Sequence, residues 1–102
     1  MSKDDKPRIK RGVIDLPPGY YPLNHAVVLM GISEPTIFRY IKDENKTEQT
    51  YIESSKYRGL RVISFDAMVN YFINTGFTEE GARTFLEKNR KKLEELIKEK
   101  KI

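Results

Sequence analysis

The sequence predicts a mostly α domain with one small β-hairpin, and three observations support this α+β class. Residues 23–42 carry apolar side chains at helical spacing on both sides of a glycine. Residues 50–64 contain two β-prone segments with polar residues and a glycine between them. Residues 77–102 are rich in strong helix formers, with apolar residues at steps of three and four. These patterns predict two short helices, a hairpin and a long helix at the carboxyl end.

Composition limits the classes of function. A chain of 102 residues corresponds to one domain, and its net charge of +4 favours a polyanionic partner. With no cysteine and His25 as the single histidine, we expect no metal site and no cofactor. No set of residues suggests acid–base or nucleophilic catalysis, so we expect no enzymatic activity. Without a long apolar run or a secretory signal, the chain is expected to be cytoplasmic and nucleoid-associated, with no membrane contact and no evident small-molecule ligand.

The chain divides into three segments by composition. Residues 1–13 have few apolar groups and are predicted to form a disordered basic arm, which either follows DNA or serves as a solubilising tail. Residues 14–76 are predicted to form the folded domain, and residues 77–102 a separate helical element. The candidate DNA contacts in the arm are Arg8, Lys10 and Arg11.

The two short helices are predicted to meet at Gly31, where a sharp turn needs positive φ. Ser33 can cap the second helix, Glu34 suits the positive end of its dipole, and Pro35 fits only a first turn. The apolar residues expected to hold the two helices together are Ala26, Val27, Met30, Ile32, Ile37, Tyr40 and Ile41.

The other side of the second helix is predicted to point outward. It carries cations, hydroxyls and an aromatic ring, which suit a DNA major groove. There, arginine pairs with guanine, threonine contacts phosphate or base, and an apolar group contacts the thymine methyl. The alternative is a helical hairpin that packs on itself and binds nothing. The candidate DNA contacts here are Ser33, Pro35, Thr36, Phe38, Arg39 and Lys42.

This stretch resembles the helix-turn-helix of the MerR and excisionase-like winged-helix families. The matching residues are Leu23, Ala26, Val27, Met30, Gly31, Ile32, Ser33, Thr36, Ile37, Arg39 and Ile41. The resemblance covers residues 20–72 and implies a winged helix-turn-helix that binds double-stranded DNA, followed here by a long C-terminal helix. Residues 20–21 are expected to form a short strand or to pack as a lid on the core, and the resemblance implies a strand that pairs with the wing. By analogy, the role would be transcription regulation, or an accessory role in recombination or partition of a phage, plasmid or integrative element.

The hairpin is predicted to be the wing. Its strands are expected at residues 51–52 and 60–63, with cations near the tip that contact sugar-phosphate or the minor groove. A charged hairpin that only completes the sheet is the alternative. Residues 64–76 supply the following helix, with Ser64 as its cap and Gly76 as its stop. The candidate DNA contacts of the wing are Lys56, Arg58 and Arg61.

The C-terminal helix is predicted to begin at the cap Thr78 and to pair two chains into a homodimer through a heptad seam. In the alternative arrangement, this helix folds back on its own core. A protein-interaction adaptor that acts through this helix, with the helix-turn-helix as scaffold, is the alternative function. The candidate dimerisation residues are Leu86, Asn89, Leu93, Leu96 and Ile97.

Overall fold

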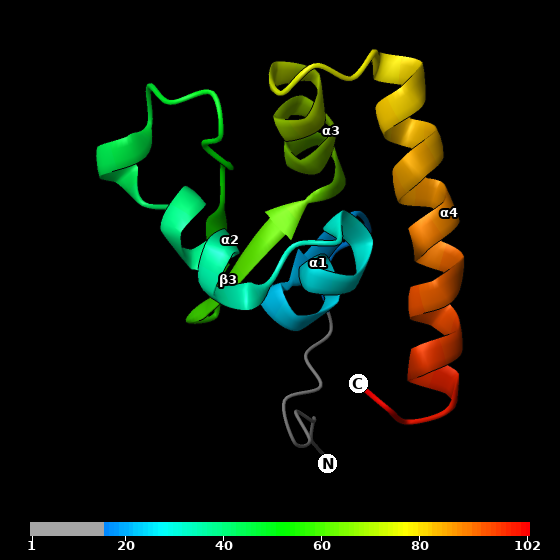
Figure 1. The fold of residues 1–102 in the computed structure, drawn as a ribbon. Coiled ribbons are helices and arrows are strands. Elements are labelled where there is room, and N and C mark those ends of the chain that lie inside the picture. Colours follow the sequence, from blue (N-terminus) through cyan, green and yellow to red (C-terminus); the bar gives the residue numbers. More distant parts are fainter. Residues whose placement is uncertain (1–15) are drawn as a thin grey trace.

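The computed structural model describes residues 16–102 (Figure 1), so the predicted arm with Arg8, Lys10 and Arg11 lies outside the described residues. The described part is α+β, with four α-helices and one small antiparallel sheet. The elements in chain order are β1 (Tyr20–Pro22), α1 (Leu23–Met30), α2 (Glu34–Tyr40), the 3-10 helix η1 (Asp43–Asn45), β2 (Ser55–Tyr57), β3 (Leu60–Ser64), α3 (Phe65–Asn74) and α4 (Glu79–Lys98).

The sheet has β3 at its centre, between β1 and β2. The chain enters β1 through a turn in which the Tyr20 N–H donates to the Pro17 carbonyl at 3.2 Å and Gly19 has φ of 85°. A residue with positive φ at this position is what a type II turn requires. β1 then pairs antiparallel with β3, which confirms the short strand predicted at residues 20–21.

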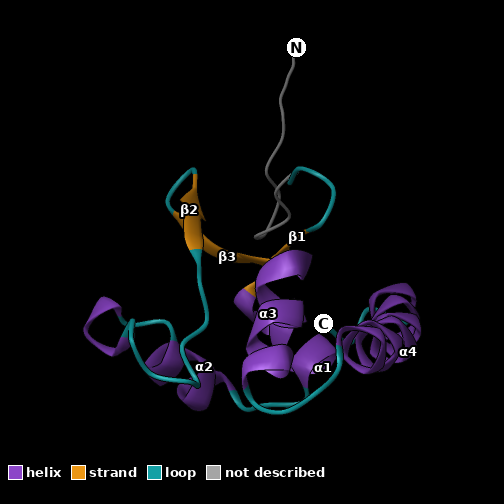
Figure 2. Ribbon diagram, turned by 90° about the horizontal axis from the view of Figure 1, so that it is seen from above, coloured by secondary structure: helices purple, strands orange, loops and turns teal. Residues whose placement is uncertain are grey.

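The core lies on one face of the sheet. Helices α1 and α3 cover this face, α4 packs against α1 and α3, and α2 packs at the side of α1 away from α4 (Figure 2). Leu29 of α1, Ile63 of β3 and Met68 of α3 are fully buried in one hydrophobic cluster. Leu29 was not among the residues predicted to hold the two short helices together, although it is among the most buried side chains.

Three helix starts and one helix end follow from local chemistry. α1 stops because Gly31 adopts φ of 70° and ψ of 26°, and its N–H donates to the Val27 carbonyl at 2.9 Å. The hydroxyls of Ser33, Ser64 and Thr78 accept hydrogen bonds from the backbone N–H groups three residues later. These caps confirm the predicted starts of α2, α3 and α4.

Helix α4 belongs to the core of its own chain. Leu86 has an exposed fraction of 0% and Leu93 is also buried, while the Asn89 Nδ2 donates to the Leu29 carbonyl at 2.9 Å. Leu86, Asn89 and Leu93 thus pack against α1 and α3 of their own chain, as in the alternative in which the helix folds back, and homodimer formation stays a prediction. Of the remaining two seam residues, Leu96 is half-buried and Ile97 is exposed.

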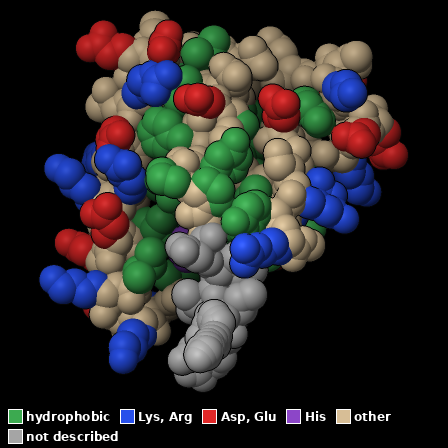
Figure 3. Space-filling view, turned by 180° about the vertical axis from the view of Figure 1, so that it is seen from behind, with side chains coloured by type: hydrophobic (Ala, Val, Ile, Leu, Met, Phe, Trp, Pro, Cys, Tyr) green, Lys and Arg blue, Asp and Glu red, His purple; other side chains and the backbone are tan. Residues whose placement is uncertain are grey.

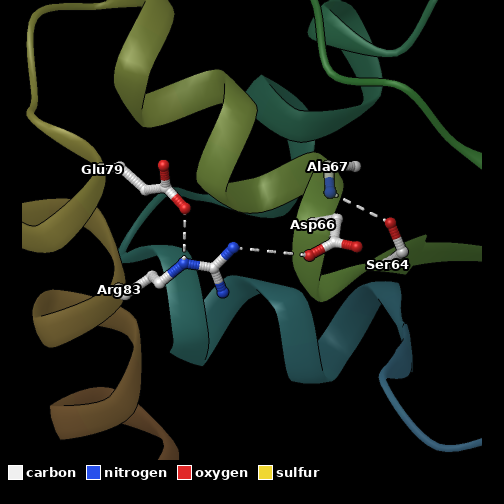
Figure 4. A network of polar contacts seen from close by, with 5 residues as sticks. All are labelled: Ser64, Asp66, Ala67, Glu79 and Arg83. Atoms are coloured by element: carbon white, nitrogen blue, oxygen red, sulfur yellow. Dashed lines mark hydrogen bonds and ion pairs between the residues drawn. The ribbon is translucent and has the colours of Figure 1, made fainter.

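Polar contacts also join α4 to α3. The Arg83 guanidinium pairs with Glu79 one turn earlier at 3.1 Å and reaches Asp66 in the first turn of α3 at 3.9 Å (Figure 4). These side chains are exposed, so each pair contributes about 1 kcal/mol or less. The attachment of α4 therefore depends mainly on its buried apolar side chains. In residues 16–102, no helix is both long and apolar enough to cross a lipid bilayer.

Candidate nucleic-acid interface

Helix α2 is held to the fold by one side and leaves the other uncovered. Its one buried side chain is Ile37, and Tyr40 packs beside Tyr71 of α3 with ring centroids 6.0 Å apart. Phe38 has an exposed fraction of 47%, the largest among the exposed aromatic side chains of residues 16–102. α4 lies on the far side of α1 and α3, and both ribbon views show α2 clear of it (Figures 1 and 2).

Most predicted DNA contacts on α2 are exposed. Ser33 and Thr36 satisfy each other at the start of the helix, where the Ser33 hydroxyl donates to the Thr36 hydroxyl at 2.9 Å. Thr36 is half-buried. The predicted contact residues that are exposed are Ser33, Pro35, Phe38, Arg39 and Lys42.

The carboxyl end of α2 is fixed by two backbone contacts from the following segment. The Asn45 side chain donates to the Arg39 carbonyl at 2.8 Å, and the Ile52 N–H donates to the Tyr40 carbonyl at 3.0 Å. Carbonyls at a helix end lack helical partners, so these bonds satisfy groups that would otherwise need water. The orientation of the exposed face of α2 is therefore set by the fold on both ends of the helix.

The β2–β3 hairpin is shorter than predicted and turns more sharply. Arg58 and Gly59 form a two-residue turn with φ of 55° and 82°, as in a type I′ turn. This turn pairs Tyr57 with Leu60 and ends the ladder at Ser55, so the predicted strand at residues 51–52 is wrong. Ile52 is instead buried, and Lys56 lies within β2 and not at the tip.

Two hairpin cations lie on the side of the sheet that faces the helices. Lys56 pairs with Arg61 across the strands, and side chains alternate along β3, so both share the face of the buried Ile63. Arg61 is half-buried, and its Nη1 donates to the Ser54 hydroxyl at 3.2 Å. Arg58 is exposed at the tip, with its guanidinium carbon 5.4 Å from the centre of the Tyr57 ring.

A groove joins α2 to the hairpin. It connects the start of α1, one side of α2 and the first residues of β3, and its lining residues are Pro22, Leu23, Asn24, Glu34, Phe38, Leu60 and Arg61. Among the predicted contacts, the structure thus brings Phe38 and Arg61 together. Arg39 and Lys42 lie toward the other end of α2, outside this lining. Asn24, Glu34 and Leu60 were not predicted as contacts, because only the packing of three separate elements places them beside Phe38.

A second hollow that carries cations lies on α4 and is lined by Arg83, Thr84, Glu87, Lys88 and Lys91, but there a carboxylate shares the lining with the cations. Seen from behind, hydrophobic side chains occupy the middle of the molecule, and acidic and basic side chains alternate along the edge that α4 forms (Figure 3). Such mixed charge gives little attraction for a polyanion. His25 is half-buried in α1, and burial lowers the pKa of its imidazole from the ordinary value of 6.5. Within residues 16–102, no three side chains of the types His, Cys, Asp and Glu gather where they could hold a metal ion.

Comparison with known proteins adds no relative. The chain matches no protein-family model, no curated protein and no solved structure.

Proposed function

We propose that this protein is a sequence-specific double-stranded DNA-binding protein of winged helix-turn-helix architecture. In this proposal α2 is the recognition helix and enters the major groove, and the β2–β3 hairpin is the wing. The observation that carries the proposal is the uncovered side of α2, which continues through a groove into the cationic hairpin.

The residues of α2 divide by the chemistry that they offer to DNA. Arg39 can donate two hydrogen bonds to a guanine edge, and Phe38 can contact a thymine methyl. Lys42 follows the helix and suits a phosphate, as does the hydroxyl of Thr36, whose oxygen accepts from Ser33 and whose O–H can still donate. An exposed phenylalanine is energetically unfavourable in water, so its burial against a base edge would favour binding.

The hairpin supplies cations at a measurable conformational cost. Arg58 has φ of 55°, a left-handed conformation that costs a residue other than glycine about 1–2 kcal/mol. Glycine or asparagine would suit this turn position better. An arginine in a strained position at the hairpin tip supports a functional role for its charge, here a contact with sugar-phosphate or the minor groove.

The proposed biological role is a transcription regulator, or a recombination or partition accessory factor of a mobile element, without enzymatic activity. The alternative adaptor function depends on an apolar face of α4 that could receive another protein. Leu86 and Leu93 are buried in the protein's own core, so an adaptor would have to use the exposed, mostly charged side of α4. DNA binding is accordingly the function that the arrangement supports best.

Selection of bound sequences from a random duplex pool tests the proposal. A sequence-specific protein enriches one motif, and the symmetry of the motif also reports whether one or two copies bind. Affinity for the motif should fall steeply as salt rises, because phosphate contacts release counterions. A protein that enriches no motif and binds no duplex at low salt would contradict the proposal.

Replacement of Arg39 tests the recognition helix directly. We expect Arg39→Ala to lose about 1–3 kcal/mol on the selected site and to relax the preference at one base position. Lys91→Ala is the matched control, since it removes one exposed cation from α4, on the other side of the molecule from α2. Equal losses for both variants on every sequence would reduce Arg39 to a contributor of charge.

A further inference from the structure

Glu34 is an unexpected residue in a proposed DNA interface. It is exposed in the first turn of α2 and lines the same groove as Phe38, Asn24 and Arg61. Arg61 lines the same groove, and its Nη1 donates to the Ser54 hydroxyl. The groove therefore contains a carboxylate beside an aromatic ring, an amide and a guanidinium.

The charge of Glu34 limits what it can face in a DNA complex. A phosphate would repel the carboxylate, so Glu34 suits only a position that faces the edges of the bases. A carboxylate accepts hydrogen bonds and cannot donate them. In the major groove, guanine presents two acceptors and thymine presents an acceptor and a methyl group. Adenine presents an amino donor beside the N7 acceptor, whereas cytosine presents only its N4 amino donor. Cytosine is thus the most favourable partner.

We propose that Glu34 is a specificity-determining residue that accepts a hydrogen bond from the N4 amino group of a cytosine. This inference rests on the proposed DNA binding by α2. Phe38 lies one helical turn further along the same side of α2, about 6 Å along the axis. Stacked base pairs are separated by about 3.4 Å. The thymine that contacts Phe38 should therefore lie about one or two base pairs from the cytosine.

A structural role for Glu34 makes a different prediction. A carboxylate in the first turn stabilises a helix through its dipole, and this effect does not depend on the DNA sequence. Loss of that effect would lower the stability of the fold and weaken all binding equally. Only a contact with a base can change which base is preferred.

The test compares motifs selected from a random duplex pool by the wild-type protein and three variants. In Glu34→Gln, the charge is lost and an amide is gained, which pairs with adenine through its N6 and N7. Glu34→Asp keeps a carboxylate on a shorter side chain. Glu95→Gln is the matched control, because it removes one exposed negative charge from α4, on the side of the molecule away from α2. Circular dichroism verifies that each variant is folded.

We expect the wild-type motif to contain one position with cytosine favoured about tenfold over other bases. Glu34→Gln should shift that position toward adenine, Glu34→Asp should retain cytosine with weaker binding, and Glu95→Gln should leave the motif unchanged. If the wild type selects a motif that Glu34→Gln leaves intact, the role of Glu34 is refuted while DNA binding stands. If the wild type selects no motif, the proposed function itself fails.

Discussion

The replacement of Leu86 by alanine is a quantitative test of how α4 is attached. Leu86 is completely buried among α1, α3 and α4, and the substitution removes its three terminal carbons. At about 0.8 kcal/mol for each buried carbon, the lost transfer free energy is about 2.4 kcal/mol. The cavity that remains raises the expected loss of unfolding free energy to about 3–4 kcal/mol. This is a large part of the 5–15 kcal/mol that is usual for a domain.

Urea unfolding followed by circular dichroism measures this loss, and Ile97→Ala provides the control. Ile97 lies on the same helix and in the same predicted seam, but its exposed fraction is 44%, so we expect a loss below about 1 kcal/mol. The urea midpoints of unfolding should be the same at low and high protein concentration, because the stability of a helix packed within one chain does not depend on the concentration of the protein. Midpoints that rise with concentration, with equal losses for the two variants, would refute the intramolecular packing of α4.

Three further predictions concern the hairpin, the only histidine and the contact between α1 and α4. Arg58→Asn should raise the unfolding free energy by up to about 1 kcal/mol, because asparagine tolerates positive φ. The same change should weaken binding to every duplex and lower the slope of affinity against salt by about 1. Unchanged binding would remove the wing from the proposal. Because burial lowers the pKa of His25 below 6.5, the unfolded chain binds the proton more tightly, so stability should fall as the pH is lowered through 6.5. His25→Gln should therefore reduce the change in the urea midpoint of unfolding between pH 7 and about pH 5, a range that lies above the ordinary carboxyl pKa values. A midpoint that falls as steeply with pH in the variant as in the wild type would contradict this assignment. Asn89→Ala should cost about 1–2 kcal/mol in urea unfolding, since it leaves the Leu29 carbonyl at the end of α1 without its partner; a loss near zero would show that water replaces the amide.

Local chemistry made much of the fold predictable. Gly31, Ser33 and Pro35 each restrict the backbone within a few residues, and the helix boundaries around them follow from those restrictions. Ser64 and Thr78 act in the same way for the later helices. Where one residue determines the conformation of its neighbours, the sequence was sufficient.

Features that depend on distant partners were harder to predict. The apolar steps through Leu86 and Leu93 fit a dimer seam and an internal core equally well, and only the apolar surface of α1 and α3 decides between them. Tyr51 and Ile52 are β-prone, but the turn at Arg58 sets the register, and the ladder ends before it reaches them.

The candidate site divides in the same way. The exposed cations and Phe38 follow from residue type and helical spacing. The groove does not, because Asn24, Glu34 and Arg61 meet only when α1, α2 and β3 pack together. Glu34 was recognised for its effect on the helix dipole, and its place beside Phe38 required the tertiary structure.

The arrangement of the sheet has a consequence for solubility. Only β3 is paired on both sides, and the two edge strands β1 and β2 have 3 residues each. Long exposed edges recruit strands from other molecules and lead to aggregation, whereas short edges with proline or charged residues do not. β1 ends at Pro22, which has no N–H to donate, and β2 carries Lys56. These two edges therefore offer little backbone on which continuous intermolecular sheets could grow.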